Sequence, residues 1–299
     1  KSKDINTGGQ IFVFFHDPCT DGMGAKYAAW RKFGNRAKYI GVNYVGPKFN
    51  PRELAEAGKN DEIYVIDFSW PREILDEVHG RVKKLVVLDH HKTSQENLAG
   101  TEYAIFDMNR SGAILAWNYF FPDEPEPTLL RMIQDRDLWQ WQIPGTRAVL
   151  NYLDIDDHDA VEKWDKYMPL QGETYRKGEI INKYQDTLIE KGLALDKVRF
   201  IRLNGDAVAI TNSTVMPSEI GSFLCGRFRV DYSITYWIQY DGIVRLSFRS
   251  IGNFDVAEIA KQYNGGGHRN ASGGRMGLIM LSDWMSREDI REELGIKHE

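Results

Sequence analysis

Short apolar runs alternate with helix-like patterns through the first part of the chain. Residues 11–15, 63–68 and 85–88 are such runs, and an Asp or a His stands at or near the end of each. Their length and their β-branched and aromatic content are typical of strands buried on both faces of a parallel sheet. Residues 22–33 and 71–82 carry apolar side chains at helical spacing. The alternation of strand and helix predicts an α/β layered domain.

The pattern changes after about residue 150. Residues 159–195 are rich in Glu, Lys and Tyr at helical spacing, and three strand-like segments follow, namely 200–203, 207–210 and 232–249. The last of these is two runs joined by Asp241-Gly242, which is a strong two-residue hairpin signal. A short helix over 256–263 then precedes a glycine-rich segment that we expect to be a loop. We therefore predict a parallel-sheet catalytic domain over 1–158, a helical connector over 159–198 and a smaller mixed-sheet α/β domain over 199–299, with the active site in the cleft between the domains.

Composition narrows the classes of partner. The 299 residues include 43 acidic and 38 basic side chains, giving a net charge of -5. This balance argues against binding to long duplex nucleic acid, which needs clustered Lys and Arg. Cys19 and Cys225 are too few for a disulfide framework, which indicates a reducing compartment. No apolar run approaches the ~20 residues of a membrane span, so we expect a cytoplasmic protein without membrane contact.

Polar side chains cluster where the predicted strands end. In open α/β sheets, ligands bind beyond the carboxyl ends of the strands, and several His and Asp residues fall there, namely His16, Asp21, Asp67, Asp89 and His90. A lone Asp at a strand end is usually a cap or turn residue, but together these residues offer the donors of a divalent-metal site. Mixed nitrogen and oxygen donors suit Mn²⁺, Zn²⁺, Co²⁺ or Fe²⁺ better than Mg²⁺. Asp67 is the candidate bridging ligand, because a carboxylate can bind one ion through each oxygen.

The order of these motifs resembles the DHH phosphoesterase family with its DHH-associated C-terminal domain. The resemblance rests on Val87-Leu88-Asp89-His90-His91, preceded by the His16-x-x-Cys19-x-Asp21-Gly22 motif and Asp67 and followed by Asp135. It continues with Ser247-Phe248-Arg249-Ser250 and with the run from Gly265 through His268 to Gly274. These motifs span residues 11 to about 275. Members of the family cleave phosphoester or phosphoanhydride bonds at dinuclear, Mn²⁺-type sites.

The resemblance assigns a role to each residue of the first domain. It implies that His16 binds one metal ion, that Asp21, His90 and Asp135 bind the other, and that Asp67 bridges them. It also implies that His91 contacts the scissile phosphate or its leaving group and that Asp89 orients neighbouring ligands. A strand-terminating turn is the simpler role for Asp89. Asp137 is the rival to Asp135 as a ligand, since both fall in the same short segment.

Cys19 departs from the family pattern, because most members have an Asp at this position of the opening motif. A thiolate ligand would favour Zn²⁺, Co²⁺ or Fe²⁺ over Mn²⁺. Alternatively, Cys19 does not bind the metal, and Asp17 or water completes the first site.

The second domain is expected to hold the substrate. Consecutive glycines, Gly265, Gly266 and Gly267, let a backbone approach a phosphate and present N–H groups to it, and His268 and Arg269 add donors. The resemblance implies that Arg249 and His268 bind a terminal phosphate of the substrate, and Asn212 or Ser213 face the same cleft. Most glycine runs are simply flexible turns.

Two aromatic residues and one arginine of the first domain have two readings each. Trp139 and Trp141 could stack on nucleobases, although packing in the core is the favoured interpretation for residues of this size. Arg110 could contact phosphate or be a solvated residue at a helix start.

We therefore expect a metal-dependent phosphodiesterase with two divalent ions, Mn²⁺ above all and Co²⁺, Zn²⁺ or Fe²⁺ on account of Cys19. By this interpretation a water activated by the ions shortens a very short single-stranded oligonucleotide from one end to mononucleotides, in the manner of an oligoribonuclease or nano-RNase. The alternatives are a phosphatase or phosphodiesterase for nucleoside bisphosphates or cyclic or linear dinucleotides, and a catalytically silent nucleotide sensor. The oligomeric state stays open, with a homodimer as one candidate.

Overall fold

The computed structural model describes residues 9–43, 52–155, 161–193 and 195–296. The chain divides into two compact units, Lys1–Asn182 and Lys183–Glu299. The division falls inside the long helix α8, Gly172–Gly192. Each unit has its own sheet and its own core.

The first unit is built on a parallel sheet, as the sequence predicts. Its five strands run in the order β2-β1-β3-β4-β5, and every neighbouring pair is parallel. The strands are β1 (Ile11–His16), β2 (Ala37–Val42), β3 (Glu62–Ile66), β4 (Lys84–Asp89) and β5 (Ala104–Phe106). The two edge strands, β2 and β5, were not predicted because they are only partly buried and lack continuous apolar runs.

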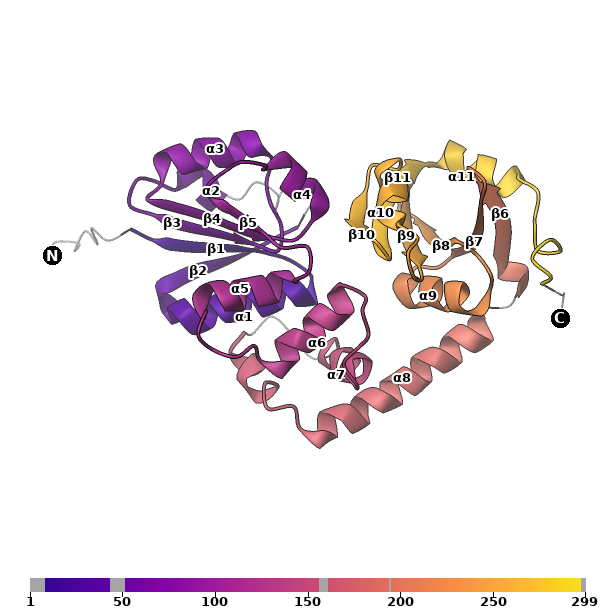
Figure 1. Cartoon of the computed structure of the whole chain (residues 1–299), viewed down its shortest axis with the longest axis horizontal. Helices are drawn as coiled ribbons and strands as arrows, with labels where there is room; N and C mark the ends of the chain where they lie inside the picture. The colour runs from indigo at the N-terminus through magenta and orange to yellow at the C-terminus, as the bar shows by residue number, and fades with distance from the viewer. Residues whose placement is uncertain (1–8, 44–51, 156–160, 194, 297–299) are drawn as a thin grey trace. The chain divides into compact units, whose positions relative to one another are not determined.

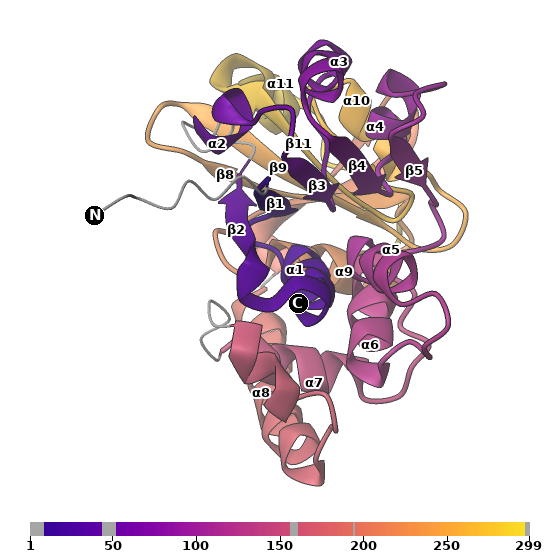
Figure 2. The same cartoon turned by 90° about the vertical axis from the view of Figure 1, so that its left-hand side faces the viewer.

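Helices cover both faces of this sheet (Figures 1 and 2). Phe12 and Phe14 of β1 face a core shared with α2 and α3, whereas Val13 and Phe15 face a core shared with α1, α5, α6 and α7. Both faces are therefore dry, which explains the unbroken apolar runs. The helices are α1 (Thr20–Phe33), α2 (Arg52–Glu56), α3 (Arg72–Arg81), α4 (Lys92–Asn97), α5 (Gly112–Phe120), α6 (Thr128–Asp137) and α7 (Thr146–Leu153), with short 3₁₀ turns at Gly34–Arg36 and Val161–Lys166.

Helix α5 packs closely on α1. A methyl group at Gly24 of α1 would lie only 2.8 Å from the Cβ of Ala113 of α5. This close approach brings the first turn of α5 to the strand ends, where the polar motifs lie.

The second unit holds a six-stranded mixed sheet in the order β10-β11-β9-β8-β7-β6. Only β7 and β8 pair in parallel, and the other neighbours are antiparallel. The strands are β6 (Val198–Leu203), β7 (Asp206–Asn212), β8 (Tyr232–Ile238), β9 (Ile243–Ser250), β10 (Gly266–His268) and β11 (Ala271–Gly277). The helices are α9 (Pro217–Arg227), α10 (Val256–Lys261) and α11 (Leu278–Ser286), after a 3₁₀ turn at Leu195–Lys197. The mixed-sheet α/β fold that the sequence predicts is confirmed.

The glycine-rich segment is not the loop that we expected. Gly266–His268 is strand β10, whose Gly266 pairs with Gly273 and whose Gly267 pairs with Ser272. A methyl group at Gly265 would lie 1.9 Å from the carbonyl oxygen of Gly273, and Gly267 has a φ of +142°. The glycines are thus required by close packing of the backbone in a hairpin.

The segment after α11 folds back on the same unit. The backbone N–H of Ile290 donates to the Phe200 carbonyl at 2.7 Å, and the Arg291 guanidinium donates to the Val198 carbonyl at 3.1 Å. These bonds attach the segment to β6, the outermost strand of the sheet.

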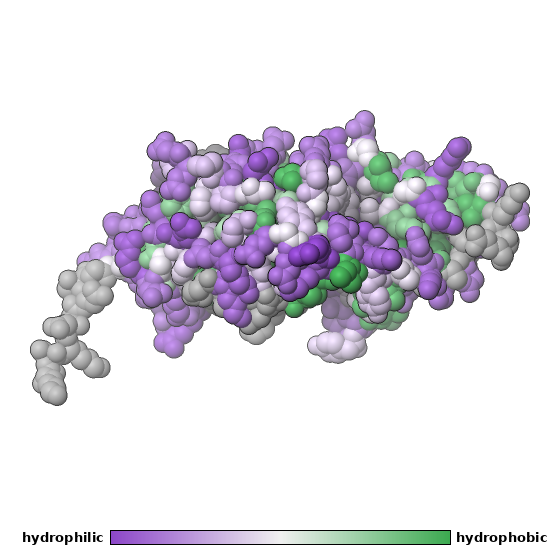
Figure 3. Space-filling view, turned by 90° about the horizontal axis from the view of Figure 1, so that it is seen from below, coloured by the Kyte–Doolittle hydropathy of each residue, from purple (hydrophilic) through white to green (hydrophobic). Residues whose placement is uncertain are grey.

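Helices in the described part of the chain are too short or too polar to cross a membrane. On the face shown in Figure 3, hydrophilic residues prevail and the hydrophobic ones form small separate groups.

Candidate metal centre

Six side chains at the carboxyl edge of the first sheet form two groups of three. The first group is His16, Cys19 and Asp67, and the second is Asp21, His90 and Asp137. In each group, one ligand atom from every member lies within 4.8 Å of those of the other two. They come from the β1–α1 turn, from the ends of β3 and β4 and from the end of α6. This agrees with the general finding that ligands of open α/β sheets bind beyond the carboxyl ends of the strands.

Asp67 links the two groups. Its Oδ1 lies 3.0 Å from Nε2 of His90 in the second group, and its Oδ2 lies 3.5 Å from Nδ1 of His16 in the first. The residue is 1% exposed, and its Oδ2 accepts no hydrogen bond within the described residues. A buried carboxylate oxygen without a donor is what a site for a cation would leave. Asp67 also has a φ of +67°, a strained conformation for a non-glycine residue.

The first turn of α5 holds the carboxylate of Asp21. The backbone N–H groups of Gly112 and Ala113 donate to its two oxygens at 2.6 and 3.0 Å, and the positive end of the helix favours a negative charge there. A methyl group at Gly112 would lie 2.5 Å from the Cβ of Asp67. Gly112 therefore shapes the centre through its lack of a side chain, a role that the sequence reasoning missed. The signal was present, because Ser111-Gly112 stands at the start of an apolar helix pattern.

The β1–α1 turn places Cys19 in the cluster and turns the side chain of Asp17 toward β2. The Asp17 carboxylate packs against Gly41 of β2, where a methyl group would lie 2.6 Å from its Oδ2. Cys19 is the member of the turn that groups with His16 and Asp67. Gly22 lets α1 begin next to the strand end, because a methyl group there would lie 2.0 Å from the His16 carbonyl oxygen.

Asp137, and not Asp135, joins the cluster. Asp135 is 2% exposed, and its carboxylate accepts from the N–H groups of Gln142 and Ile143 and from the hydroxyl of Thr146. The Asp137 Oδ2 lies 3.7 Å from Nε2 of His90. Side chains two positions apart in a helix point in directions that differ by about 200°. The carboxylates of Asp135 and Asp137 at the end of α6 therefore face different surroundings. This geometry favours Asp137 over Asp135 as the candidate ligand.

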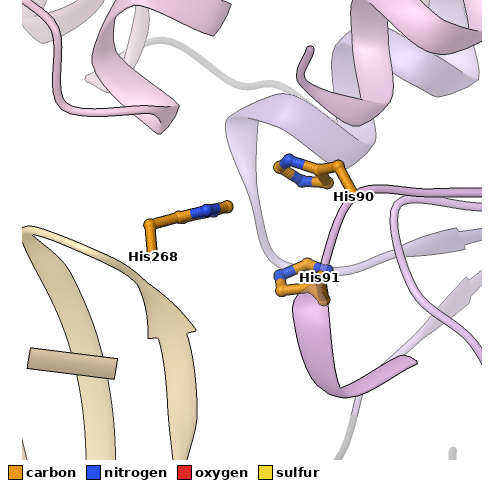
Figure 4. Close-up of side chains that lie close together, drawn as sticks. All are labelled: His90, His91 and His268. Carbon is orange, nitrogen blue, oxygen red and sulfur yellow. The ribbon is translucent and has the colours of Figure 1, made fainter. Parts of the chain in front are cut away.

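Asp89 orients the two histidines that follow it. Its Oδ1 accepts from the backbone N–H of His90 at 2.7 Å and lies 2.7 Å from Nδ1 of His91. Asp89 is fully buried, and its interaction with His91 helps to lower its pKa against the opposing effect of burial. The rings of His90 and His91 lie side by side, with centroids 4.7 Å apart (Figure 4). Asp89 thus does more than end a strand.

The cluster carries an excess of buried negative charge. Burial, together with Asp67 and Asp137, raises the pKa of Asp21 well above its ordinary value, and burial with Asp67 does the same for the Cys19 thiol. Burial opposes a charge on His90, but Asp137 and Asp67 outweigh it and raise its pKa to about 10. Cations would relieve this repulsion. Carboxylate, imidazole and thiol donors fit a transition-metal ion better than Mg²⁺.

The second unit contains the other predicted site residues. Arg249 on β9 is 9% exposed, and its guanidinium donates to the carbonyls of Phe248 and Ser272 and to the hydroxyl of Ser218 at the start of α9. Burial lowers the pKa of Arg249 to about 10. His268, drawn in Figure 4, ends β10 and is half-buried, and Arg269 is exposed at the turn that follows.

Three other predicted residues make contacts with neighbouring residues of their own unit. Asn212 and Ser213 both donate to the carbonyl of Tyr236 at the end of β8. The Arg110 guanidinium binds the carboxylate of Glu126 at 2.5 Å, which favours the structural role for Arg110.

Trp139 and Trp141 are not core residues. Trp141 is 39% exposed, Trp139 is half-buried, and their ring centroids lie 5.1 Å apart in a T-shaped arrangement. The interpretation as core packing is therefore wrong.

Comparisons with known proteins find similar chains over most of this length. The DHHA1 domain model matches residues 218–285, within the second unit. An uncharacterized protein of Acanthamoeba polyphaga mimivirus is 30% identical over 292 residues, covering 91% of this chain and 69% of that protein. Oligoribonuclease NrnB of Bacillus subtilis is 24% identical over 282 residues, covering 85% and 70%. A 3',5'-cyclic-nucleotide phosphodiesterase of Helicobacter pylori is 22% identical over 263 residues, covering 71% and 72%.

Proposed function

The chain belongs to the DHH phosphoesterase family with a DHH-associated C-terminal domain and is a phosphoesterase, and from this membership we propose that it hydrolyses short oligonucleotides to mononucleotides with two bound divalent ions. The two groups of donors, which are linked through the carboxylate of Asp67, carry the proposal. A carboxylate with one oxygen in each group is suited to bridging two ions.

The proposed ligands follow the two groups. His16 and Cys19 would hold one ion, Asp21, His90 and Asp137 would hold the other, and Asp67 would bind both. Divalent ions held there would supply Lewis acidity toward a phosphoryl oxygen and toward water. The thiol of Cys19 favours Zn²⁺, Co²⁺ or Fe²⁺ at the first position, and the nitrogen and oxygen donors of the second suit Mn²⁺.

His91 is the proposed proton donor to the leaving oxygen. Its Nδ1 lies 2.7 Å from the ionised Asp89, so this nitrogen carries a proton and Nε2 is left for the substrate. Burial opposes a charge on His91, but Asp89 outweighs it and raises the pKa of His91. A protonated His91 can release the second proton to a departing sugar oxygen.

The second unit would bind the far phosphate of the substrate. Arg249 is buried and positively charged, and a phosphate there would compensate its charge. His268, Arg269 and the hairpin that begins at Gly265, Gly266 and Gly267 complete the proposed phosphate site. Arg110 is left out because Glu126 already neutralises it.

The similarity to an oligoribonuclease over 85% of the chain supports an oligonucleotide substrate. A second candidate is the hydrolysis of a small cyclic nucleotide, which the Helicobacter pylori relative supports. In both cases the substrate is short, in agreement with the net charge of -5.

A substrate panel tests the proposal. Purified protein is incubated with Mn²⁺, Co²⁺, Zn²⁺ or Mg²⁺ and offered dinucleotides, longer oligomers, 3',5'-cyclic nucleotides and cyclic dinucleotides. We expect the highest kcat/KM on the di- and trinucleotides with one of the first three ions. Highest turnover of the cyclic nucleotides would favour the second candidate, and no turnover of any phosphoester would overturn both.

A matched pair of variants tests the ligand set. Asp137→Asn should reduce the number of bound ions measured by mass spectrometry, whereas Asp135→Asn, two residues away, should leave that number unchanged. The reverse result would restore Asp135 as the ligand.

A further inference from the structure

A pair of tryptophans, one half-buried and one exposed, follows α6 directly. Trp139 and Trp141 lie in the loop between α6 and α7, with ring centroids 5.1 Å apart at 79°. Trp141 is 39% exposed, although a ring of this size usually gains by burial. Because the two rings are almost perpendicular, the face of one indole can stack on a planar ligand while the other indole contacts the ligand's edge.

The backbone of this loop is strained at the two tryptophans. Trp139 has a φ of +57° and Trp141 a φ of +55°. Bulky L-residues rarely adopt this region, and such strain is kept where the surrounding structure imposes it and function uses it.

Asp135 imposes the conformation. Its buried carboxylate binds the N–H of Gln142 at 2.7 Å and that of Ile143 at 3.1 Å, and its backbone carbonyl accepts from the N–H of Trp141 at 3.3 Å. The far end of the loop is also fixed, because Gly145, with a φ of +84°, packs against the ring of Tyr175 on α8. The tryptophan pair is therefore pre-organised, which reduces the entropy lost when a ligand stacks on it.

The loop begins at the candidate metal centre. Trp139 is two residues beyond Asp137, so their Cα atoms are no more than about 7 Å apart. This separation is short enough for a side chain at Trp139 to reach a group attached to a phosphate at the centre.

We propose that Trp139 and Trp141 stack on a nucleobase of the substrate whose phosphate lies at the metal centre, and that Asp135 is the positioning residue for this surface. The proposal rests on the proposed function, since it needs a nucleotide at that centre. It makes the first unit selective for phosphodiesters that carry a base next to the scissile bond.

The test compares two substrates, a diadenylate and the same dinucleotide with both bases removed. We expect the wild type to prefer the diadenylate, and the preference is the ratio of the two kcat/KM values. Stacking of one base corresponds to a factor of about 5 to 100. Trp139→Ala and Trp141→Ala should lower the ratio by a factor in this range, chiefly through KM. Phe at either position should restore part of it.

Tyr240→Ala is the matched control, because Tyr240 is a fully exposed aromatic residue in the second unit. It should leave the ratio unchanged. Quenching of tryptophan fluorescence by a non-hydrolysable diadenylate should weaken in Asp135→Asn while that variant keeps its bound ions.

Two failures are distinguishable. If the wild type cleaves neither dinucleotide, the proposed function fails. If it cleaves the diadenylate and both tryptophan variants keep the wild-type ratio within twofold, the stacking surface is overturned and the proposed function stands.

Discussion

The carboxyl edge of the first sheet and the Arg249 region of the second unit bury charge of opposite sign. At the edge, burial and neighbouring carboxylates raise the pKa of Asp21. Around Arg249, burial lowers the pKa of the guanidinium to about 10 against the opposing effect of Glu219, and the Phe248 carbonyl and the Ser218 hydroxyl accept hydrogen bonds from it. For Asp21 and for Arg249 the charged form is the disfavoured one. A cation beside Asp21 and an anion beside Arg249 would stabilise that form.

The largest effect is expected from removal of the Asp67 carboxylate in the first region. Asp67→Ala removes the carboxylate that links the two groups, so bound metal should disappear and kcat/KM should fall more than about 1,000-fold, since even outer partners of metal ligands cost about 10–100-fold. Mass spectrometry and initial rates measure the two changes. Asp123→Ala, an exposed Asp in the loop before α6, is the control. Full metal content in Asp67→Ala would contradict the assignment.

A smaller loss of activity and stability is expected from substitution of Gly112. Its methyl group in Gly112→Ala would lie 2.5 Å from Asp67 Cβ, and overpacking of this kind costs about 1–3 kcal/mol. Thermal unfolding should begin at lower temperature, and kcat/KM should fall about 10- to 100-fold. Gly80→Ala on α3 is the matched control, because nothing lies within 4 Å of its new methyl group and alanine favours a helix. Equal behaviour of the two variants would speak against the role of Gly112.

A change in the second region should alter KM and leave the metal content unchanged. Gly265→Ala places a methyl group 1.9 Å from the Gly273 carbonyl oxygen and distorts the β10–β11 hairpin. We expect KM to rise about tenfold, which is about 1.4 kcal/mol, with the metal content unchanged. Gly226→Ala on α9 has a free position and serves as control. Loss of metal in Gly265→Ala would contradict the assignment of metal binding to the first region alone.

The smallest effect concerns pH in the metal-free protein. The pKa of His90 is raised from 6.5 to about 10, so its contribution to stability is complete below about pH 6.5 and is lost as the pH rises toward 10. Burial also raises the pKa of Cys19, which acts in the same direction above the ordinary thiol pKa of 9.0. Urea unfolding in a chelator should therefore give a free energy of unfolding that falls between these pH values. His90→Gln should flatten the slope, and an unchanged slope would contradict the assignment.

The sequence predicted the parallel sheet because its central strands are buried on both faces. It also predicted the residues at the strand ends, because chain connectivity sends every carboxyl end of a parallel sheet to one edge. Asp135 and Asp137 could not be separated in this way, since the choice depends on how the end of α6 is turned. That turn is set by the hydrogen bonds of Asp135 to the loop that follows.

Side-chain size misled the interpretation of the tryptophans. Trp139 and Trp141 are apolar enough for the core, but the positive φ of both residues turns the loop so that one ring is exposed. Glycine misled it in the second unit, where the run from Gly265 suggested a loop and the structure has strand β10. The nearby backbone of β11 requires those glycines for tight pairing, and strand pairing of this kind is a long-range contact that local composition does not reveal.

The segment after α11 protects the sheet of the second unit from other chains. An outermost strand offers unpaired backbone groups on which a foreign strand can add, and this is a common route to aggregation. Ile290 and Arg291 occupy the carbonyls of Phe200 and Val198 on β6. At the opposite edge, β10 is only three residues long. Removal of residues 287–296 would free these two carbonyls of β6, and we expect the shortened protein to associate with itself more readily.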